Sequence, residues 1–230
     1  MKILGLIGGI SWVSTIDYYR MINQGINQKL GDLNFAECII HSFNYQDIKR
    51  NNDAEDWDNT LRMLTKAGLN MKNSGAQAIV LCANTMHMIA DQLEQNVQLP
   101  LIHIATSTAN SISERGLKKV GLLGTKFTME RPFFRDKLTR QGIEVVIPDD
   151  NERDFIHYSI FEELGRNLFK AETKQFYLNV MHKLAGQGAE GIIMGCTEIP
   201  LLIGQDDIDI PLFDTTQIHS EAAVAFALND

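Results

Sequence analysis

Cys196 is the residue of this chain whose type and place are best suited to chemistry. It follows the apolar run 191–195 and precedes Thr197 and Glu198, so we expect it where a strand ends and a helix begins. A helix N-terminus lowers a thiol pKa from about 8.5 toward neutrality, and a thiolate acts as a base or a nucleophile. Cysteine is also among the residues most often buried for packing alone. By position, both roles stay open for Cys196.

Short polar side chains follow other apolar runs in the same way. Such neutral side chains can donate to a carboxylate and accept from an ammonium group. Serine, threonine and asparagine also cap helices, so one such residue alone proves little, but their recurrence at several loops favours binding. Glu198 bonds a substrate ammonium, tunes the Cys196 thiol, or is a first-turn acid that the helix dipole favours. The predicted substrate-binding residues are Ile10, Ser11, Asn84, Thr85, Thr125, Thr128, Thr197 and Glu198.

The sequence contains no motif for a nucleotide cofactor or a metal. The glycine-rich segment GLIGGIS at 5–11 lacks the lysine of a phosphate-binding loop and the spacing of a dinucleotide fold. Its glycines favour instead a close approach of the backbone to a small ligand. Three cysteines, Cys38, Cys82 and Cys196, lie far apart with no CxxC or HExxH spacing. Neither a disulfide framework nor a metal site is therefore predicted.

Hydrophobic patterning predicts the elements that position these residues. Apolar runs of roughly four to eight residues, each followed by glycine or polar residues, are typical of buried parallel strands. Segments with helical periodicity lie between them, and this alternation predicts an α/β fold with parallel sheets. The expected strands are 3–8, 38–43, 78–82, 101–104, 120–124, 144–148, 191–196 and 211–214, and the expected helices are 15–30, 55–74, 106–116, 129–141, 171–187 and 216–228.

The two halves of the chain resemble each other. Residues 75–85, GAQAIVLCANT, can be laid over 188–198, GAEGIIMGCTE, and the glycines of LGLIGG match those of VGLLGT at nearly the same offset. This repeat predicts two pseudo-symmetric domains, although unrelated buried strands also look alike. We assign 1–100 plus 212–230 to an N-terminal domain and 101–211 to a C-terminal domain. Ligands bind beyond the carboxyl ends of parallel strands, so the active-site cleft is expected between the domains.

Composition limits the partners of the protein. The formal net charge is −8 and the 21 basic residues are scattered, which argues against a nucleic-acid or anionic-membrane surface. No run of about 18 apolar residues predicts a membrane span, and the N-terminus shows no cleavable signal. We expect a cytoplasmic protein with a small-molecule substrate, no nucleic-acid partner and no membrane contact.

Five motifs, GLIGGISWVST, LCANTMH, LLGTKFTM, MGCTEIP and DTTQIH, resemble the aspartate/glutamate racemase family, specifically its aspartate racemase-like branch. The resemblance implies two similar α/β domains, an isomerase that uses neither pyridoxal phosphate nor metal, and a homodimer. It implies one cysteine on each face of the substrate Cα, where one thiolate removes a proton and the opposite thiol delivers another. Cys196 matches the second of these thiols. The donors assigned to the α-carboxylate are Asn84, Thr85, Thr125 and Thr197.

The chain departs from the family pattern at the first cysteine. In the family that cysteine directly precedes Asn-Thr, whereas this position holds Ala83 here and Cys82 lies one residue earlier. A shift of one residue on a strand turns a side chain to the other face, so we expect Cys82 to point into the core. Cys82 and Thr85 are the candidates for a second acid or base.

Three functions fit these residues. The first is an amino-acid racemase for aspartate- or glutamate-like substrates, in which Arg166 binds the distal carboxylate and a water or hydroxyl replaces the missing thiol. The second is a single-cysteine decarboxylase or isomerase of a small dicarboxylic acid. The third is a catalytically inactive amino-acid-binding protein that keeps the anion-binding loops. Fold similarity alone does not choose among them.

Overall fold

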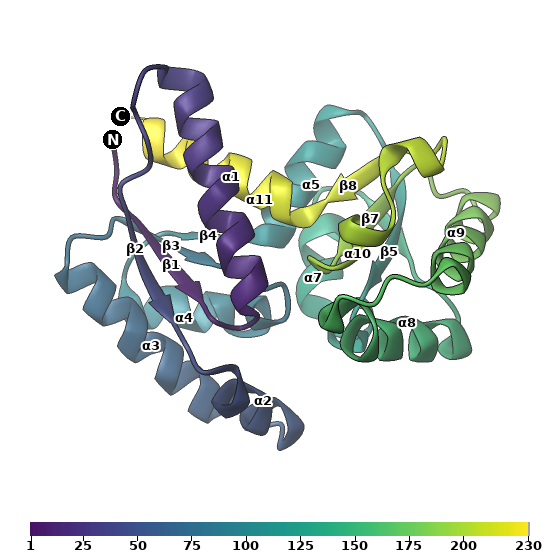
Figure 1. The fold of residues 1–230 in the computed structure, drawn as a ribbon, viewed down its shortest axis with the longest axis horizontal. Coiled ribbons are helices and arrows are strands. Elements are labelled where there is room, and N and C mark those ends of the chain that lie inside the picture. Colours follow the sequence, from purple (N-terminus) through teal and green to yellow (C-terminus); the bar gives the residue numbers. More distant parts are fainter. Residues whose placement is uncertain (230) are drawn as a thin grey trace. The chain divides into compact units, whose positions relative to one another are not determined.

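The computed structural model describes residues 1–229 and divides into two compact units. Unit 1 comprises Met1–Ile104 and the chain from His219 onward, and unit 2 comprises Ala105–Ile218. Each unit is built on a four-stranded parallel sheet flanked by helices (Figure 1). The predicted fold class, an α/β protein with two parallel-sheet domains, is confirmed. The cleft expected between the domains stays a prediction.

The sheet of unit 1 has the strand order β2-β1-β3-β4, and every neighbouring pair is parallel. Its strands are β1 (Leu4–Gly8), β2 (Cys38–Ser42), β3 (Ala78–Leu81) and β4 (Leu101–Ile102). The connecting segments are α1 (Trp12–Leu30), α2 (Tyr45–Asp53), α3 (Trp57–Asn73), the 3-10 turn η1 (Thr85–Ile89) and α4 (Ala90–Val97).

The sheet of unit 2 has the order β6-β5-β7-β8, again parallel throughout. Its strands are β5 (Lys119–Gly124), β6 (Glu144–Val146), β7 (Ile192–Gly195) and β8 (Leu212–Asp214). Helices α5 (Ile104–Glu114), α6 (Lys126–Glu130), α7 (Pro132–Thr139), α8 (Asp150–Glu162), α9 (Ala171–Gly186) and α10 (Ile199–Leu202) accompany it, with 3-10 turns η2 (Leu164–Arg166) and η3 (Gln205–Asp207).

The two sheets share one topology, as the internal repeat predicts. In each, the first strand along the chain lies between the second and the third. The last helix of each half belongs to the other unit: α5 follows β4 yet lies almost wholly in unit 2, and α11 (Thr215–Leu228) follows β8 and enters unit 1 at His219. Strand β8 pairs with β7, so residues 212–214 lie in unit 2 instead of the N-terminal domain assigned to them above.

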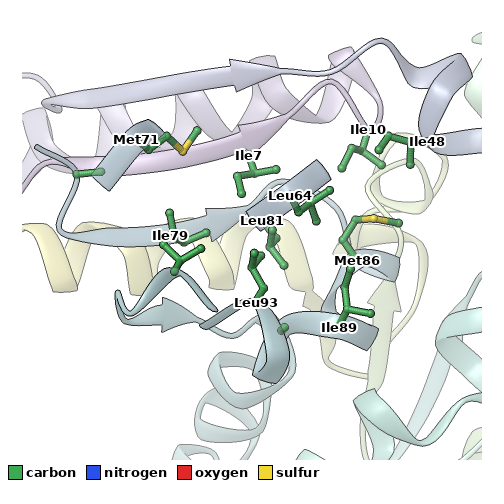
Figure 2. Packing of buried hydrophobic residues seen from close by; sticks show 13 residues of the cluster. Ile7, Ile10, Ile48, Leu64, Met71, Ile79, Leu81, Met86, Ile89 and Leu93 are labelled. Atoms are coloured by element: carbon green, nitrogen blue, oxygen red, sulfur yellow. The ribbon is translucent and has the colours of Figure 1, made fainter. Parts of the chain in front are cut away.

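Alternating side chains of the unit 1 strands fill two separate apolar layers, because both faces of a parallel sheet are covered. On one face Ile7, Ile79 and Leu81 pack against α2, α3, η1 and α4, and Figure 2 shows these side chains converging with Leu64 and Met86. On the other face Leu4, Leu6, Ala78 and Val80 pack against α1 and α11. Within residues 1–229 we find no helix with the length and apolarity that a membrane span requires.

A buried hydrogen-bonded pair joins α11 to the rest of unit 1. His219 is fully buried, its Nε2 bonds the carbonyl of Ile102 at 2.6 Å, and its Nδ1 lies 2.8 Å from the hydroxyl of Tyr18. A carbonyl only accepts, so Nε2 carries the proton and Nδ1 accepts from Tyr18. Burial lowers the pKa of His219 to about 4. The neutral imidazole is therefore the form that the fold requires.

We expect acid to destabilise the protein through His219. Because its folded pKa lies below the unfolded value of about 6.5, the unfolded chain binds the proton more readily, and stability falls as the pH drops from about 6.5 toward 4. Between pH 7 and pH 5 this residue alone removes about 2 kcal/mol from the free energy of unfolding. Urea unfolding of wild type and His219→Gln at both pH values measures it. An equal pH dependence in the two proteins would contradict the assignment.

Candidate active site

The carboxyl end of β7 carries the candidate thiol. β7 ends at Gly195, and the partly exposed residues Cys196, Thr197 and Glu198 form the turn before α10. The thiol of Cys196 donates to Oε2 of Glu198 at 2.7 Å, and the hydroxyl of Thr197 donates to the same oxygen at 2.8 Å. One carboxylate oxygen therefore accepts two hydrogen bonds directly beside the thiol.

The surroundings of Cys196 raise the pKa of its thiol well above the ordinary value. Burial of the sulfur has the largest effect, and the charge and the hydrogen bond of Glu198 add to it. The backbone N–H groups of Thr197 and Glu198 act in the opposite direction, because they stabilise a thiolate. The sequence-based expectation of a pKa near neutrality is wrong, since α10 has only four residues and its dipole does not outweigh these effects. At neutral pH the resting form is the thiol.

Glu163 organises the loop that packs beside this turn. The segment η2 contacts α10. The carbonyl of Glu163 accepts from the backbone N–H groups of Arg166 and Leu168, and its carboxylate accepts from Lys170 at 2.8 Å and from Thr173 at 2.5 Å. Burial alone would raise the pKa of Glu163, but the bonds from Lys170 and Thr173 lower it overall. The loop is thus held in place by a charged, fully bonded carboxylate.

Tyr177 of α9 lies close to the same turn, and the sequence analysis did not predict it. Its buried hydroxyl lies 3.0 Å from the hydroxyl of Ser159. Burial raises the pKa of Tyr177, the bond with Ser159 lowers it, and the nearby Cys196, Glu163 and Glu198 raise it further. Tyr177 is therefore a neutral phenol near Cys196, Glu163 and Glu198.

The carboxyl end of β5 places Thr125 and Thr128 in structural roles. Oγ1 of Thr125 accepts from the backbone N–H of Thr128 at 3.3 Å and so caps α6. Thr128 is fully buried, and a Cβ at Gly124 or Gly195 would touch its side chain. These two glycines are paired between β5 and β7. Thr128 therefore fills the space where the two strand ends approach, and Thr125 directly follows the glycine that pairs with Gly195.

The carboxyl end of β1 is a strained turn. Ser11 has a φ of 107°, a conformation that non-glycine residues rarely adopt. Oγ1 of Thr15 accepts from the backbone N–H of Gly9 at 2.9 Å and donates to the carbonyl of Ser11 at 3.0 Å, which holds the turn in place. Ile10, predicted to bind substrate, lies in the core layer shown in Figure 2, whereas Ser11 stays partly exposed.

After the carboxyl end of β3, the side chains of Cys82 and Ala83 face opposite sides of the sheet. Cys82 is fully buried in the layer formed with α1 and α11, following Ala78 and Val80 on the same face. Ala83 faces the opposite layer and stays partly exposed. Burial raises the pKa of the Cys82 thiol far above its ordinary value. The alternation expected from the sequence is therefore present.

Strand pairing gathers the candidates into one group in each unit. In unit 2, pairing of Gly124 with Gly195 brings Thr125 beside the turn of Cys196. In unit 1, pairing of Ile7 with Leu81 places the carboxyl ends of β1 and β3, from which residues 8–11 and 82–85 continue, next to each other. His87 supports the second group, because its Nδ1 bonds the carbonyls of Ala83 and Asn84. Across residues 1–229, no cluster of three or more His, Cys, Asp or Glu side chains suits a metal ion.

Known proteins resemble this chain in sequence and in fold. The family model of Asp/Glu/hydantoin racemases matches residues 7–223. The chain belongs to that family. A crystal structure of a candidate Asp/Glu racemase from Yersinia pestis is 47% identical, with a TM-score of 0.96 over 100% of both chains. An aspartate racemase homologue from Pyrococcus horikoshii is 35% identical, with a TM-score of 0.89 over 100% of both chains. The broad-specificity amino-acid racemase RacX of Bacillus subtilis is 22% identical, with 96% of each chain covered.

Membership in the Asp/Glu/hydantoin racemase family makes this chain a racemase-type isomerase. Ala83, at the position where the sequence motif suggested a first thiol, packs against one apolar layer and stays partly exposed, whereas the neighbouring Cys82 is enclosed in the other layer. Among the three cysteines of the described residues, Cys196 is the one whose partly exposed thiol lies at the carboxyl end of a strand, since Cys38 begins β2.

We expect thiol reagents to distinguish the three cysteines. In the native protein Cys196 and Cys38, both partly exposed, react slowly but completely at alkaline pH, whereas Cys82 reacts only as fast as the protein unfolds, because its side chain has no solvent contact. Mass spectrometry of the alkylated peptides measures each rate, and protein in concentrated urea serves as the control in which all three react. Labelling of native Cys82 at the rate of Cys38 would contradict its placement in the core.

Proposed function

We propose that this family member racemises an α-amino acid through the Cys196 thiol, without pyridoxal phosphate. The supporting observation is the hydrogen bond from Cys196 to Glu198 at the partly exposed carboxyl end of β7. A thiol placed between a carboxylate and two backbone N–H groups can both give up a proton and take one back, as an acid–base catalyst must.

The proposed reaction begins with removal of the α-proton. The Cys196 thiolate takes the proton, the C–H bond breaks, an S–H bond forms, and the electron pair moves into the α-carboxylate to give an enediolate. Hydrogen-bond donors around that carboxylate stabilise the new charge. We assign this binding to Asn84, Thr85, Thr125 and Thr197, of which Thr85 and Thr197 are partly exposed.

Racemisation also requires a proton on the opposite face of Cα. Unit 1 carries Ala83 where the family has its first thiol, and Cys82 is enclosed in the core. We propose that the hydroxyl of Thr85, or a water that it binds, supplies this proton: its O–H bond breaks as the C–H bond forms, and the oxygen anion takes a proton back from solvent. A hydroxyl is a much weaker acid than a thiol, so return of the proton by Cys196 to its original face should outpace inversion.

We propose aspartate- or glutamate-like substrates, with Arg166 as the residue that binds the distal carboxylate. Arg166 lies in η2, which contacts α10. Its guanidinium pairs with Glu162 at 2.6 Å, and both side chains are exposed. Such a pair contributes about 1 kcal/mol or less, so the guanidinium can exchange it for a substrate carboxylate. The homodimer and the cytoplasmic location implied by the sequence stay predictions.

We expect loss of the α-proton when the protein is incubated with aspartate or glutamate in deuterated water. NMR of each enantiomer follows the exchange. Cys196→Ser should reduce the rate by at least about 100-fold, because the catalytic thiol is gone, whereas Cys82→Ser should leave it within about threefold of wild type.

Other outcomes of this experiment separate the alternatives. Exchange that survives in Cys196→Ser would refute the proposed thiol mechanism. No exchange with any enantiomer, together with carbon dioxide release from a substituted malonate, would identify the decarboxylase, which needs one thiol only. Binding of aspartate without either reaction would identify an amino-acid-binding protein.

Restoring the missing thiol should accelerate inversion. In Ala83→Cys a second thiol stands at the partly exposed end of β3, so we expect racemisation to rise at least about tenfold relative to α-proton exchange. Chiral chromatography of the product measures inversion, and NMR measures exchange in the same sample. Ala83→Ser is the matched control, because it adds a similar volume without a thiol. Equal ratios in the two variants would contradict the assignment of position 83.

A further inference from the structure

Oε2 of Glu198 is the acceptor of the Cys196 thiol, and the structure gives this oxygen a specific place. It lies 2.7 Å from Sγ of Cys196 and 2.8 Å from Oγ1 of Thr197. We propose that Glu198 accepts the proton of Cys196 to form the catalytic thiolate and returns it in the reverse step. This inference rests on the proposed function, since it names the group that makes Cys196 a base.

The proton transfer balances within the pair. The S–H bond of Cys196 breaks as an O–H bond forms on Oε2 of Glu198, so a thiol and a carboxylate become a thiolate and a carboxylic acid. The thiolate then takes the substrate α-proton and becomes a thiol again. When Cys196 delivers its proton to the enediolate, the carboxylic acid of Glu198 restores the S–H bond. No other reactant is needed.

The local electrostatics make such a partner necessary. Burial and the Glu198 charge raise the pKa of Cys196, so the thiol does not lose its proton to water at neutral pH to any useful extent. Transfer to Glu198 removes the carboxylate charge that opposes the thiolate. The backbone N–H groups of Thr197 and Glu198 then stabilise the sulfur anion. Both side chains are partly exposed, so the carboxylic acid can exchange its proton with solvent.

The other titratable groups near Cys196 already have hydrogen-bond partners. Glu163, at the end of α8, accepts from Lys170 and Thr173, and these bonds lower its pKa. Tyr177 of α9 has a raised pKa and bonds Ser159. Glu163 is thus a charged, bonded carboxylate and Tyr177 a neutral phenol. Glu198 is the carboxylate that accepts a hydrogen bond from the thiol, so the acceptor role falls to it.

The test compares two measurements on Glu198→Gln. Removing the carboxylate charge should lower the pKa of Cys196, so the alkylation rate of Cys196, followed by peptide mass spectrometry, should shift to lower pH by about one unit or more. The α-proton exchange rate should nevertheless fall at least about 100-fold, because the proton acceptor is gone. More thiolate with less activity is a combination that a purely structural role does not produce.

Two further variants sharpen the comparison. Glu190→Gln makes the same change just before β7, where the carboxylate accepts from the backbone N–H groups of Lys118 and Lys119, and both profiles should match wild type. Glu198→Asp keeps a carboxylate and should recover part of the exchange rate. Circular dichroism and thermal melting confirm that each variant is folded.

The outcomes decide the inference separately from the proposed function. An unshifted alkylation profile in Glu198→Gln, or unchanged exchange, overturns the role of Glu198. Wild-type protein that exchanges no amino acid overturns the proposed function, whereas the alkylation shift still reports whether the carboxylate controls the thiol. A shift to lower pH with retained exchange overturns the transfer step, because the thiolate then forms without Glu198.

Discussion

Side chains of a buried parallel strand must face one of two apolar layers, and this alternation decides where chemistry is possible in the molecule. In β3 and its extension, Ala78, Val80 and Cys82 face α1 and α11, while Ile79, Leu81 and Ala83 face the opposite layer. A charged group in either layer costs too much free energy without a partner. Reactive side chains are therefore confined to the first residues beyond the strand ends, where exposure begins. Cys196 and Cys82 both directly follow a strand, but Cys196 is partly exposed, whereas Cys82 faces the layer of α1 and α11 and is fully buried.

Most of the fold could be predicted, because buried strands appear in the sequence as short apolar runs and the two domains appear as an internal repeat. The expected strands match the observed ones to within a few residues. The similarity of residues 75–85 to 188–198 correctly predicted two sheets with the same topology. Helix α8 was missed, although the capping box of Asp149 and Glu152 marks its start. The single helix expected at 129–141 is two helices, since Pro132 begins α7 after the chain leaves α6 at Arg131.

The site was less predictable, because its details depend on packing between segments that are distant in sequence. Threonines at strand ends look alike in a sequence, but Thr128 is fully enclosed beside Gly124 and Gly195, whereas Thr197 bonds the same carboxylate oxygen as the thiol of Cys196. Thr15 contacts the turn after β1 from helix α1, and Tyr177 lies near the turn of Cys196 on helix α9. Neither the type nor the sequence position of these two residues indicated that they lie near a strand end. Ile10 follows a glycine pair that suggests a ligand loop, yet its side chain completes an apolar layer.

The sign of the Cys196 pKa shift shows why a thiol in such a site need not be pre-ionised. A thiolate and a carboxylate 2.7 Å apart repel each other strongly, so the charge of Glu198 opposes ionisation of Cys196 and helps to raise the pKa of its thiol. In the proposed transfer the proton moves from sulfur to oxygen along the hydrogen bond, and the negative charge moves from oxygen to sulfur. The backbone N–H groups of Thr197 and Glu198 stabilise the charge on sulfur, whereas the hydroxyl of Thr197 stabilises it on oxygen. The resting state is therefore the thiol, and in the proposed mechanism the thiolate forms only as its proton passes to the neighbouring carboxylate.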